Sequence, residues 1–336
     1  MKPHKFLFFL FYSCFIMPCT LAQCGCSVID NSEDLDSISN PYENKTSSDF
    51  IAVFGDIQYY TNISYIDLFE HSLNWINYAA NNINILCVLH TGDITNQNGI
   101  STNWQYFGKA INSFSPSIPF VSNIGDHDYD WKGALIYDRY STHFNEYTQS
   151  SAVMTRIEAT FEPGRMENIV VRNEIHGERY DLLLLEFGPR KEVVEWARNW
   201  VSSHPDIKYI LMNHEYLEMG GGRKTKGLKC KMRLKGGCVT PEELWNKLIR
   251  CNDNIAWVLC GHVGGLYAVT YEKNDFGREV CQMQHNIQGK PYRYDNWLMM
   301  WEFPEKSDEA IVSIVNTRTG LLFDGNNELF KFKYRY

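Results

Sequence analysis

Short apolar runs alternate with segments of helical spacing along most of this chain. A strand buried on both faces is almost continuously apolar, whereas a surface helix has apolar residues every three or four positions. The runs predicted to be strands are 50–55, 85–89, 120–122, 180–187, 208–212 and 255–260. The segments predicted to be helices are 65–80, 103–114, 191–201 and 241–249. This alternation predicts an α/β fold.

The rhythm changes after residue 265, where strand-like runs follow one another without a convincing helix. These runs are 266–271, 280–287, 297–303 and 310–315. We expect residues 266–336 to supply the strands of a second sheet packed on the first, giving two mainly mixed sheets flanked by helices. No linker or repeat divides the chain, so residues 50–336 are predicted to form one domain. Residues 217–240, rich in Gly, Lys and Arg, are predicted to be an excursion from this fold and are called the basic excursion below.

The N-terminus has the features of a secretory signal. Lys2, His4 and Lys5 precede the apolar run 6–17, and Thr20-Leu21-Ala22 supplies small residues for cleavage. We therefore expect residues 1–22 to be a signal peptide and 23–49 a linker, and the protein to be secreted, periplasmic or a cell-surface lipoprotein. A lipid anchor at Cys24 is the alternative, although Gln23 stands where a small residue is expected. No later segment is long enough to predict a transmembrane helix.

Composition narrows the function further. A chain of 336 residues with 44% hydrophobic content can bury a large core, and its net charge of −8 argues against a broad basic surface for nucleic acid. Neither property excludes a small anionic substrate. The chain has ten cysteines, and export would permit disulfides. Cys230 and Cys238 flank a short basic segment, and we predict a local bridge between them.

Polar residues follow nearly every predicted strand. These strand ends are Asp56-Ile57-Gln58, Thr91-Gly92-Asp93, Asn123-Ile124-Gly125-Asp126-His127-Asp128, Asn213-His214-Glu215 and Gly261-His262. In an open α/β sheet the loops at the carboxyl ends of the strands meet in one crevice, so we expect these groups to converge. A single strand end of this kind is explained by a helix cap or a turn, but five together are not.

Carboxylates, an amide oxygen and imidazoles that converge in one place suit divalent cations. Two such ions a few ångströms apart can clamp the attacking and leaving oxygens of phosphoryl transfer. An aspartate shared between the ions would be Asp93. The nucleophile would be a hydroxide that bridges them, with its pKa lowered by both charges. We expect Mn²⁺ or Mg²⁺, with Zn²⁺ or iron as alternatives.

The ordered strand ends resemble the motif blocks of the calcineurin-like metallophosphoesterases, D-x-[HQ], G-D, G-N-H-[DE], H and G-H-x-H. A closer resemblance is to a bacterial secreted branch with a D-x-Q-Y first block and E-N and E-F-G-P-R runs. The corresponding segments here are Asp56-Ile57-Gln58-Tyr59, Glu167-Asn168 and Glu186-Phe187-Gly188-Pro189-Arg190. The resemblance extends from about residue 50 to the C-terminus.

The resemblance implies two metal sites and one acid. The first metal would be held by Asp56, Gln58 and Asp93, and the second by Asp93, Asp126, His214 and His262. His127 would donate a proton to the leaving oxygen or stabilise charge on the phosphate, and Asp128 would orient it.

The chain departs from the family pattern at two positions. Asp126 replaces a neutral asparagine ligand, and Gly264 stands where the second histidine of G-H-x-H would bind the first metal. The first site is therefore expected to be weak, rich in water or completed by another group, for which His285 and Gln288 are candidates.

Other polar residues have simpler interpretations. His90 is expected to be a hydrogen-bonded strand residue, and Glu215 to face solvent. Arg190 and Glu167 fit a structural ion pair at least as well as a substrate contact. Trp104 and Trp131 are each either rim or core residues.

The basic excursion has seven Lys or Arg residues between Arg223 and Lys235 and no acid. It fits either a solvated loop or a cover that steers anions into the crevice.

We therefore predict a metal-dependent hydrolase of phosphate mono- or diesters, with a small, lipid or nucleotide ester as substrate. Two rivals stay open. One is a catalytically impaired protein that binds metal or phosphate, and the other is a surface interaction module on the same fold.

Overall fold

The computed structural model describes residues 38–336 apart from 133–135, 141, 327 and 336. Its first sheet has six strands in the order β16-β15-β14-β1-β2-β3. These strands are β1 (Ser48–Phe54), β2 (Asn84–His90), β3 (Phe120–Ser122), β14 (Trp297–Pro304), β15 (Glu309–Asn316) and β16 (Phe330–Lys333). β1, β2 and β3 are parallel, and β14 pairs antiparallel with β1. The sheet is therefore mixed.

The second sheet runs β12-β13-β11-β10-β9-β7-β6, with β8 paired to β9. Its strands are β6 (Ile157–Thr160), β7 (Ile169–Val171), β8 (Glu174–Ile175), β9 (Glu178–Leu184), β10 (Lys208–Met212), β11 (Ile255–Cys260), β12 (Tyr267–Lys273) and β13 (Glu279–His285). β9, β10, β11 and β13 are parallel to their neighbours in this group. A separate hairpin joins β4 (Asp130–Lys132) to β5 (Ile136–Asp138).

Aromatic side chains fill the space between the two sheets. The ring of Trp257 on β11 lies 4.7 Å from Phe332 of β16 and 6.2 Å from Trp301 of β14, measured between centroids. Strand alternation separates two cores: Leu182 and Leu184 of β9 belong to this inner core, whereas Leu183 and Leu185 face the helices behind the second sheet. The two sheets therefore form a sandwich with helices outside.

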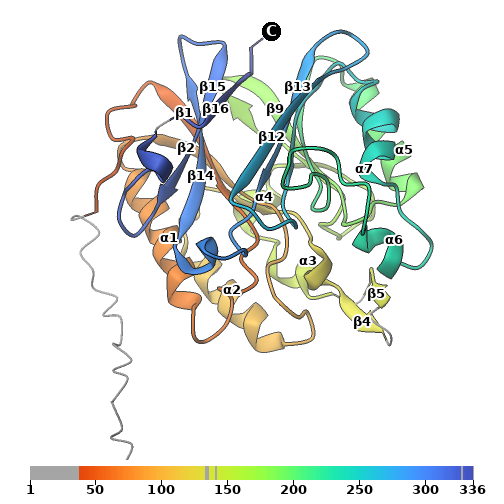
Figure 1. The fold of residues 1–336 in the computed structure, drawn as a ribbon, viewed down its shortest axis with the longest axis horizontal. Helices are drawn as coiled ribbons and strands as arrows, with labels where there is room; N and C mark the ends of the chain where they lie inside the picture. Colours follow the sequence, from red (N-terminus) through yellow and green to blue (C-terminus); the bar gives the residue numbers. More distant parts are fainter. Residues whose placement is uncertain (1–37, 133–135, 141, 327, 336) are drawn as a thin grey trace, which may run out of the picture. The chain divides into compact units, whose positions relative to one another are not determined.

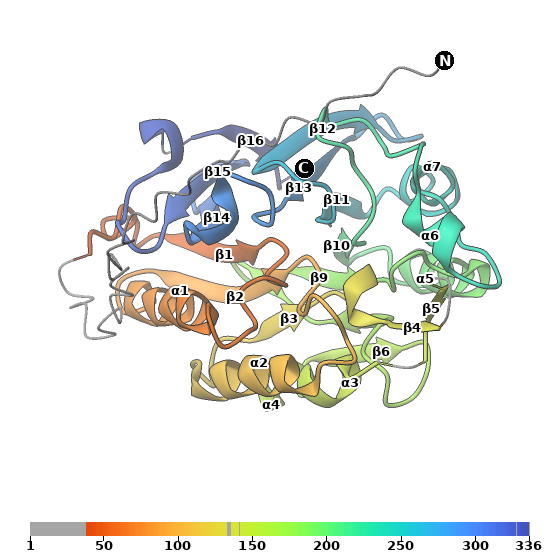
Figure 2. The same cartoon turned by 60° about the horizontal axis from the view of Figure 1, so that its bottom comes forward.

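Helices cover the outer face of each sheet (Figures 1 and 2). α1 (Ile66–Ala79) and α2 (Ser101–Ser113) lie against the first sheet, where Phe69 packs 5.4 Å from Phe54 and 6.1 Å from Phe120. α5 (Lys191–Ser203) and α7 (Pro241–Leu244), which continues as a π-helical turn, share a core with the second sheet. The remaining short helices are α3 (Phe144–Tyr147), α4 (Ser151–Met154) and α6 (Lys229–Arg233).

The predicted α/β sandwich is confirmed, but one assignment is wrong. Strands after residue 266 do not all belong to the second sheet, because β14, β15 and β16 return to the first sheet. β1 has two edges, one paired with β2 and the other with β14. β14 is mostly apolar and buried on both faces, a pattern that fits the interior of either sheet, so only the tertiary pairing decides between them.

Four further expectations concern the N-terminal segments, a membrane helix and a disulfide. Tyr42 lies in the segment expected to be a linker, yet it is buried and its hydroxyl is 2.7 Å from Ser313 Oγ. The signal peptide at 1–22 and Cys24 lie outside the described residues. Among the described residues, no helix is long and apolar enough to cross a membrane. Cys230 and Cys238 are free thiols, so the predicted bridge is not formed in the structure.

Candidate metal centre

Glycines allow the strand-end loops to approach one another. A β-carbon at Gly125 would lie 2.1 Å from Asp93 Oδ1, and one at Gly92 would lie 2.7 Å from His214 Nδ1. Asp93 and His262 themselves adopt the left-handed conformation, with φ of 59° and 68°. Non-glycine residues rarely adopt this conformation without compensation from their surroundings, and they concentrate at functional sites. The loops after β2, β3, β10 and β11 are therefore built to bring their side chains together.

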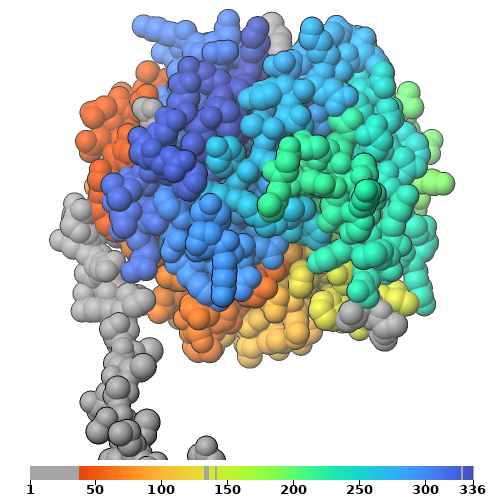
Figure 3. All heavy atoms as spheres, viewed as in Figure 1, coloured from red at the N-terminus to blue at the C-terminus, as the bar shows by residue number. Residues whose placement is uncertain are grey.

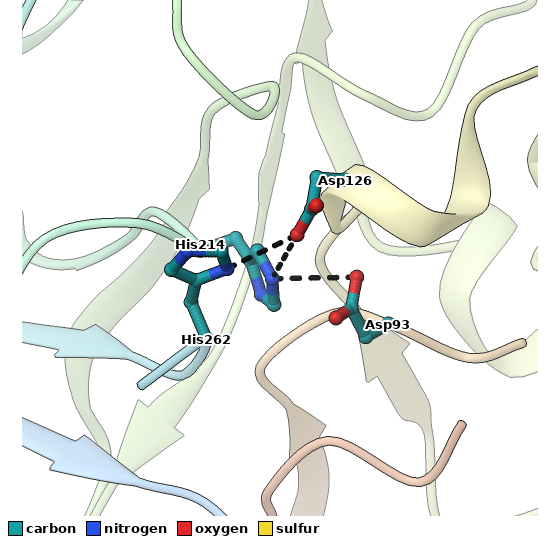
Figure 4. A group of neighbouring side chains, drawn as sticks. All are labelled: Asp93, Asp126, His214 and His262. Atoms are coloured by element: carbon teal, nitrogen blue, oxygen red, sulfur yellow. Dashed lines mark hydrogen bonds and ion pairs between the residues drawn. The ribbon is translucent and has the colours of Figure 1, made fainter. Parts of the chain in front are cut away.

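Four of the predicted ligands form a buried cluster (Figure 4). Asp93, Asp126, His214 and His262 each offer a ligand atom, and these atoms all lie within 4.8 Å of one another. His262 Nδ1 is 3.0 Å from Asp126 Oδ1, and His214 Nε2 is 3.3 Å from Asp93 Oδ1 and 3.4 Å from Asp126 Oδ1. This set matches the site that the resemblance assigns to the second metal.

The second oxygen of Asp126 has partners that sequence reasoning missed. Tyr137 donates its hydroxyl to Asp126 Oδ2 at 2.6 Å, and Lys229 Nζ donates to the same oxygen at 3.0 Å. Burial raises the pKa of Asp126, but the charge of His262 and the hydrogen bond from His262 hold it well below the usual range. Asp126 is therefore an ionised carboxylate at the centre of the cluster.

Glu215 is buried, so the expectation that it faces solvent is wrong. Its Oε1 lies 3.3 Å from His262 Nε2, and the same carboxylate accepts the backbone N–H groups of Lys229 and Cys230 at 2.9 and 3.1 Å. Burial raises the pKa of Glu215, but the hydrogen bond and charge of His262 and the two backbone donors lower it to about 2. Burying this carboxylate is favourable because four hydrogen-bond donors, including Lys224 Nζ at 3.1 Å, replace the water molecules that would solvate it at the surface.

Asp56 lies beside the cluster rather than in it. Its oxygens accept the Thr91 hydroxyl at 3.1 Å, the His262 backbone N–H at 3.2 Å, and the side-chain amides of Asn286 and Gln288 at 2.8 and 2.9 Å. Burial raises the pKa of Asp56 to about 6, with the charge of Asp93 adding to the effect and the charges of His214 and His262 opposing it.

Gln58 and Gln288 share the space next to Asp56. Gln58 Nε2 donates to Gln288 Oε1 at 2.7 Å, while Gln58 Oε1 is buried and has no hydrogen-bond partner among the described residues. Gln288, one of the two candidates to complete the first metal site, is therefore adjacent to that site. His285 donates from Nδ1 to the carbonyl oxygen of Leu266 at 2.8 Å, and burial lowers the pKa of His285 to about 4.

His127 is held at the edge of the cluster. Its Nδ1 is 2.7 Å from the carbonyl oxygen of Asn96, which leaves Nε2 on the side of Asp126, 3.9 Å from Oδ2. Burial lowers the pKa of His127, but the charges of Asp93 and Asp126 and the bond to Asn96 more than offset this and raise it. The exposed ring of Trp131 lies 6.0 Å from the imidazole, between centroids.

Asp128 does not orient His127, so that predicted role is wrong. Its carboxylate accepts the backbone N–H groups of Gly125 at 2.9 Å and Thr95 at 3.1 Å, which ties the loop after β3 to the loop after β2. Burial, followed by the charge of Asp93, raises the pKa of Asp128 to about 7. The carbonyl of Asn96 performs the positioning that was assigned to Asp128.

Several simpler interpretations agree with the structure. His90 is a buried strand residue with Nδ1 2.7 Å from Ser122 Oγ, and Trp104 is a core residue. Arg190 pairs with Glu186 at 2.9 Å and Glu162 at 3.1 Å, which is a structural ion network. Glu167 is also buried and pairs with Arg165.

The site residues that sequence reasoning missed differ in whether a pattern in the sequence could have identified them. Asn286 and Gln288 follow β13, so the same strand-end rule that selected the ligands could have found them. Lys229 stood in the basic excursion as one cation among seven. Tyr137 had no signal, because only tertiary packing brings the β4–β5 hairpin to Asp126.

Two mixed sheets with a buried aspartate–histidine cluster at the strand ends are the architecture of a metallophosphoesterase. A family model described as calcineurin-like phosphoesterase matches residues 51–265. The chain belongs to this family.

The relatives found are distant or partial. The chain is 27% identical over 266 residues to the uncharacterized protein YvnB of Bacillus subtilis (strain 168), covering 77% of this chain and 19% of that protein. It is 27% identical over 104 residues to the "probable inactive purple acid phosphatase 24" of Arabidopsis thaliana, covering 30% of this chain and 17% of the other. The chain thus spans less than a fifth of each of these curated relatives.

A solved structure shares the fold. The purple acid phosphatase PPD1 from yellow lupin (Lupinus luteus) seeds aligns with a TM-score of 0.53 over 88% of this chain and 56% of that chain. The sequence identity is 14%, so the likeness concerns the fold alone.

Proposed function

We propose that this chain hydrolyses phosphate mono- or diesters with the help of divalent metal ions. The observation that carries the proposal is the buried cluster of Asp93, Asp126, His214 and His262, whose ligand atoms lie within 4.8 Å of one another. Two carboxylates and two imidazoles form a donor set that divalent cations accept. Membership of the calcineurin-like phosphoesterase family agrees with this chemistry.

The cluster suits a cation better than it suits a purely structural role. His214 Nε2 is fully buried and has no hydrogen-bond partner among the described residues, although it lies beside two carboxylate oxygens. Leaving a buried polar atom without a partner costs about 1–3 kcal/mol, which a bound cation would remove. His214 Nδ1 is 2.9 Å from Thr91 O, so this bond fixes the ring with Nε2 toward the cluster.

The first metal would be held by Asp56, Gln58 and Asp93. The buried, unpartnered Gln58 Oε1 supports this assignment. Asp56 already accepts hydrogen bonds from four groups, so a cation must compete with them for its oxygens. The first site should therefore bind more weakly than the second. Mn²⁺ or Mg²⁺ is the expected ion at both sites, and Zn²⁺ or iron the alternative.

Bound divalent cations supply Lewis acidity toward phosphoryl oxygens and an activated water. The chain's own contribution is to orient the ester and to supply a proton. Asn96 holds His127 by Nδ1, which leaves Nε2 to donate to the leaving oxygen. Trp131 stands beside His127 with its side chain exposed, so it is placed to border the path of the leaving group.

The test measures metal content and hydrolysis of 4-nitrophenyl phosphate and bis(4-nitrophenyl) phosphate by Mn²⁺-loaded protein. We expect hydrolysis of at least one ester by the wild type and none above background by Asp93→Asn, with Asp67→Asn, an exposed change on α1, matching the wild type. Undiminished turnover by Asp93→Asn would refute the proposed site.

A second candidate function is a protein that binds metal or phosphate without turnover. Gly264 in place of a histidine and the resemblance to a plant protein named "probable inactive" favour it. This protein would bind Mn²⁺ yet hydrolyse neither ester.

The remaining assignments complete the proposal. The protein belongs to the bacterial secreted D-x-Q branch and acts outside the cytoplasm, after removal of residues 1–22, with lipidation at Cys24 as the alternative form. N-terminal sequencing of exported protein tests whether residues 1–22 are removed, and mass spectrometry tests whether Cys24 carries a lipid. A chain that keeps Met1 and stays in the cytoplasm would contradict these assignments.

A further inference from the structure

The basic excursion comes back to the metal centre at one point. It begins directly after Tyr216, and Glu215 holds its short helix α6 through the backbone N–H groups of Lys229 and Cys230. A backbone bridge between Leu234 and Tyr137 fixes the other side. In Figure 3 this segment, drawn in green, lies on the surface beside residues drawn in light blue. The excursion is therefore anchored over the cluster and is not a free solvated loop.

Two other cations of the excursion already pair with carboxylates of their own. Arg223 pairs with Glu242 and Glu272 at 2.7 and 2.5 Å, and Lys224 Nζ pairs with Glu215 at 3.1 Å. Lys231 and Lys235 are exposed and line a separate cavity with Arg139 and Arg190. Lys229 differs from these residues because it is directed at a predicted metal ligand.

The ammonium of Lys229 lies 3.0 Å from Asp126 Oδ2, while its side chain is 37% exposed. An ammonium has three N–H donors, and the structure gives this one a single acceptor among the described residues. The other donors are free to meet a solute on the open side of the cluster. Asp126 Oδ1 faces His214 and His262, so the carboxylate connects the cluster on one side with Lys229 on the other.

We propose that Lys229 binds a non-bridging oxygen of the substrate phosphate. The inference rests on the proposed function, in which an ester phosphate lies at the cluster. A phosphate there places its anionic oxygens next to Asp126, where a fixed cation offsets the repulsion between the two anions. Charge-assisted N–H···O bonds of this type are among the stronger hydrogen bonds in proteins. The excursion thus supplies a phosphate-binding residue rather than general steering alone.

A different role for Lys229 would be to neutralise Asp126 and nothing more. The two roles differ in what they predict for ligands. A phosphate-binding lysine changes the dissociation constant for phosphate, whereas a pure counter-ion changes only the affinity for cations.

The experiment titrates inorganic phosphate into Mn²⁺-loaded wild type, Lys229→Met, Lys229→Arg and Lys231→Met by calorimetry, with a separate Mn²⁺ titration of each metal-free protein. Losing one charge-assisted hydrogen bond should weaken phosphate binding by Lys229→Met about 10- to 100-fold. Lys229→Arg should recover part of this loss. Lys231→Met, on the exposed face of the same helix, should stay within about twofold of the wild type.

Two results would overturn the inference. One is a phosphate dissociation constant of Lys229→Met within about twofold of the wild type while Mn²⁺ affinity rises, which identifies a counter-ion. The other is a wild type that binds Mn²⁺ but no phosphate. Wild-type protein that binds phosphate through Lys229 but hydrolyses no ester would instead refute the proposed function and leave this inference standing.

Discussion

His262 Nε2 lies 3.3 Å from a carboxylate oxygen of Glu215, on the side of the ring opposite Asp126, which is 3.0 Å from Nδ1. A carboxylate behind a metal-binding imidazole fixes its orientation and raises its basicity. Glu215 also accepts the backbone N–H of Lys229, so one side chain positions a predicted ligand and the basic excursion together.

The first prediction concerns this pair. Glu215→Gln should lower Mn²⁺ affinity about 10- to 100-fold, because the amide cannot support His262 as an anion does. Glu218→Gln, an exposed change three residues further along, is the matched control. Calorimetric titration of metal-free protein measures both. Equal affinity of Glu215→Gln and wild type would remove Glu215 from the support of the centre.

The second prediction concerns His127. His127→Ala should leave Mn²⁺ stoichiometry unchanged and reduce turnover of an alkyl phosphate by roughly two to four orders of magnitude, the usual contribution of a positioned acid. The loss should be much smaller for 4-nitrophenyl phosphate, whose leaving group needs no proton. Parallel steady-state measurements on the two esters check this. The same loss for both esters would show that His127 positions the phosphate instead.

The third prediction uses the pKa of Asp56, which burial raises to about 6 in the folded, metal-free protein from an ordinary value of 3.8. At a pH between these two pKa values, Asp56 keeps its proton in the folded state and has lost it in the unfolded state. The free energy of unfolding therefore falls as pH rises. The expected fall attributable to Asp56 is about 3 kcal/mol.

Asp56→Asn should lack this fall. Denaturant unfolding with a chelator at pH 4 and pH 7 gives the difference between variant and wild type, and Asp67→Asn serves as the exposed control. The variant should gain stability relative to the wild type at the higher pH. A difference that does not change with pH would mean that Asp56 is not buried as a carboxyl group in the metal-free protein.

The fourth prediction concerns Cys230 and Cys238. Their β-carbons lie 2.4 and 3.2 Å from the point where a side chain at Gly188 would begin, so the two free thiols stand close together. Mild oxidation should therefore join them, and closing this short loop should stabilise the protein by about 2–3 kcal/mol. Peptide mapping and unfolding of oxidised wild type, Cys238→Ser and Cys251→Ser test this. Both thiols still open to alkylation after oxidation would contradict it.

The sequence identified the ligand cluster because the relevant information is local. Asp93, Asp126, His214 and His262 each follow a strand that is visible as an apolar run, and parallel strands bring their carboxyl ends to one edge of each sheet. Asp93 and Asp126 follow strands of the first sheet and His214 and His262 strands of the second, so the packing of the two sheets brings the two pairs together. The six runs predicted as strands before residue 261 all contain strands.

The tertiary structure decided what surrounds that cluster. Whether Glu215 faces inward, whether Asp128 reaches His127 and which sheet β14 joins depend on partners far along the chain, which no local pattern encodes. Lys229 is the clearest example of a residue that the sequence could not single out, because the excursion has seven cations that look alike in sequence. Only the packing of α6 against Glu215 places one of them on Asp126, since an ion pair depends on distance in space and not on spacing along the chain.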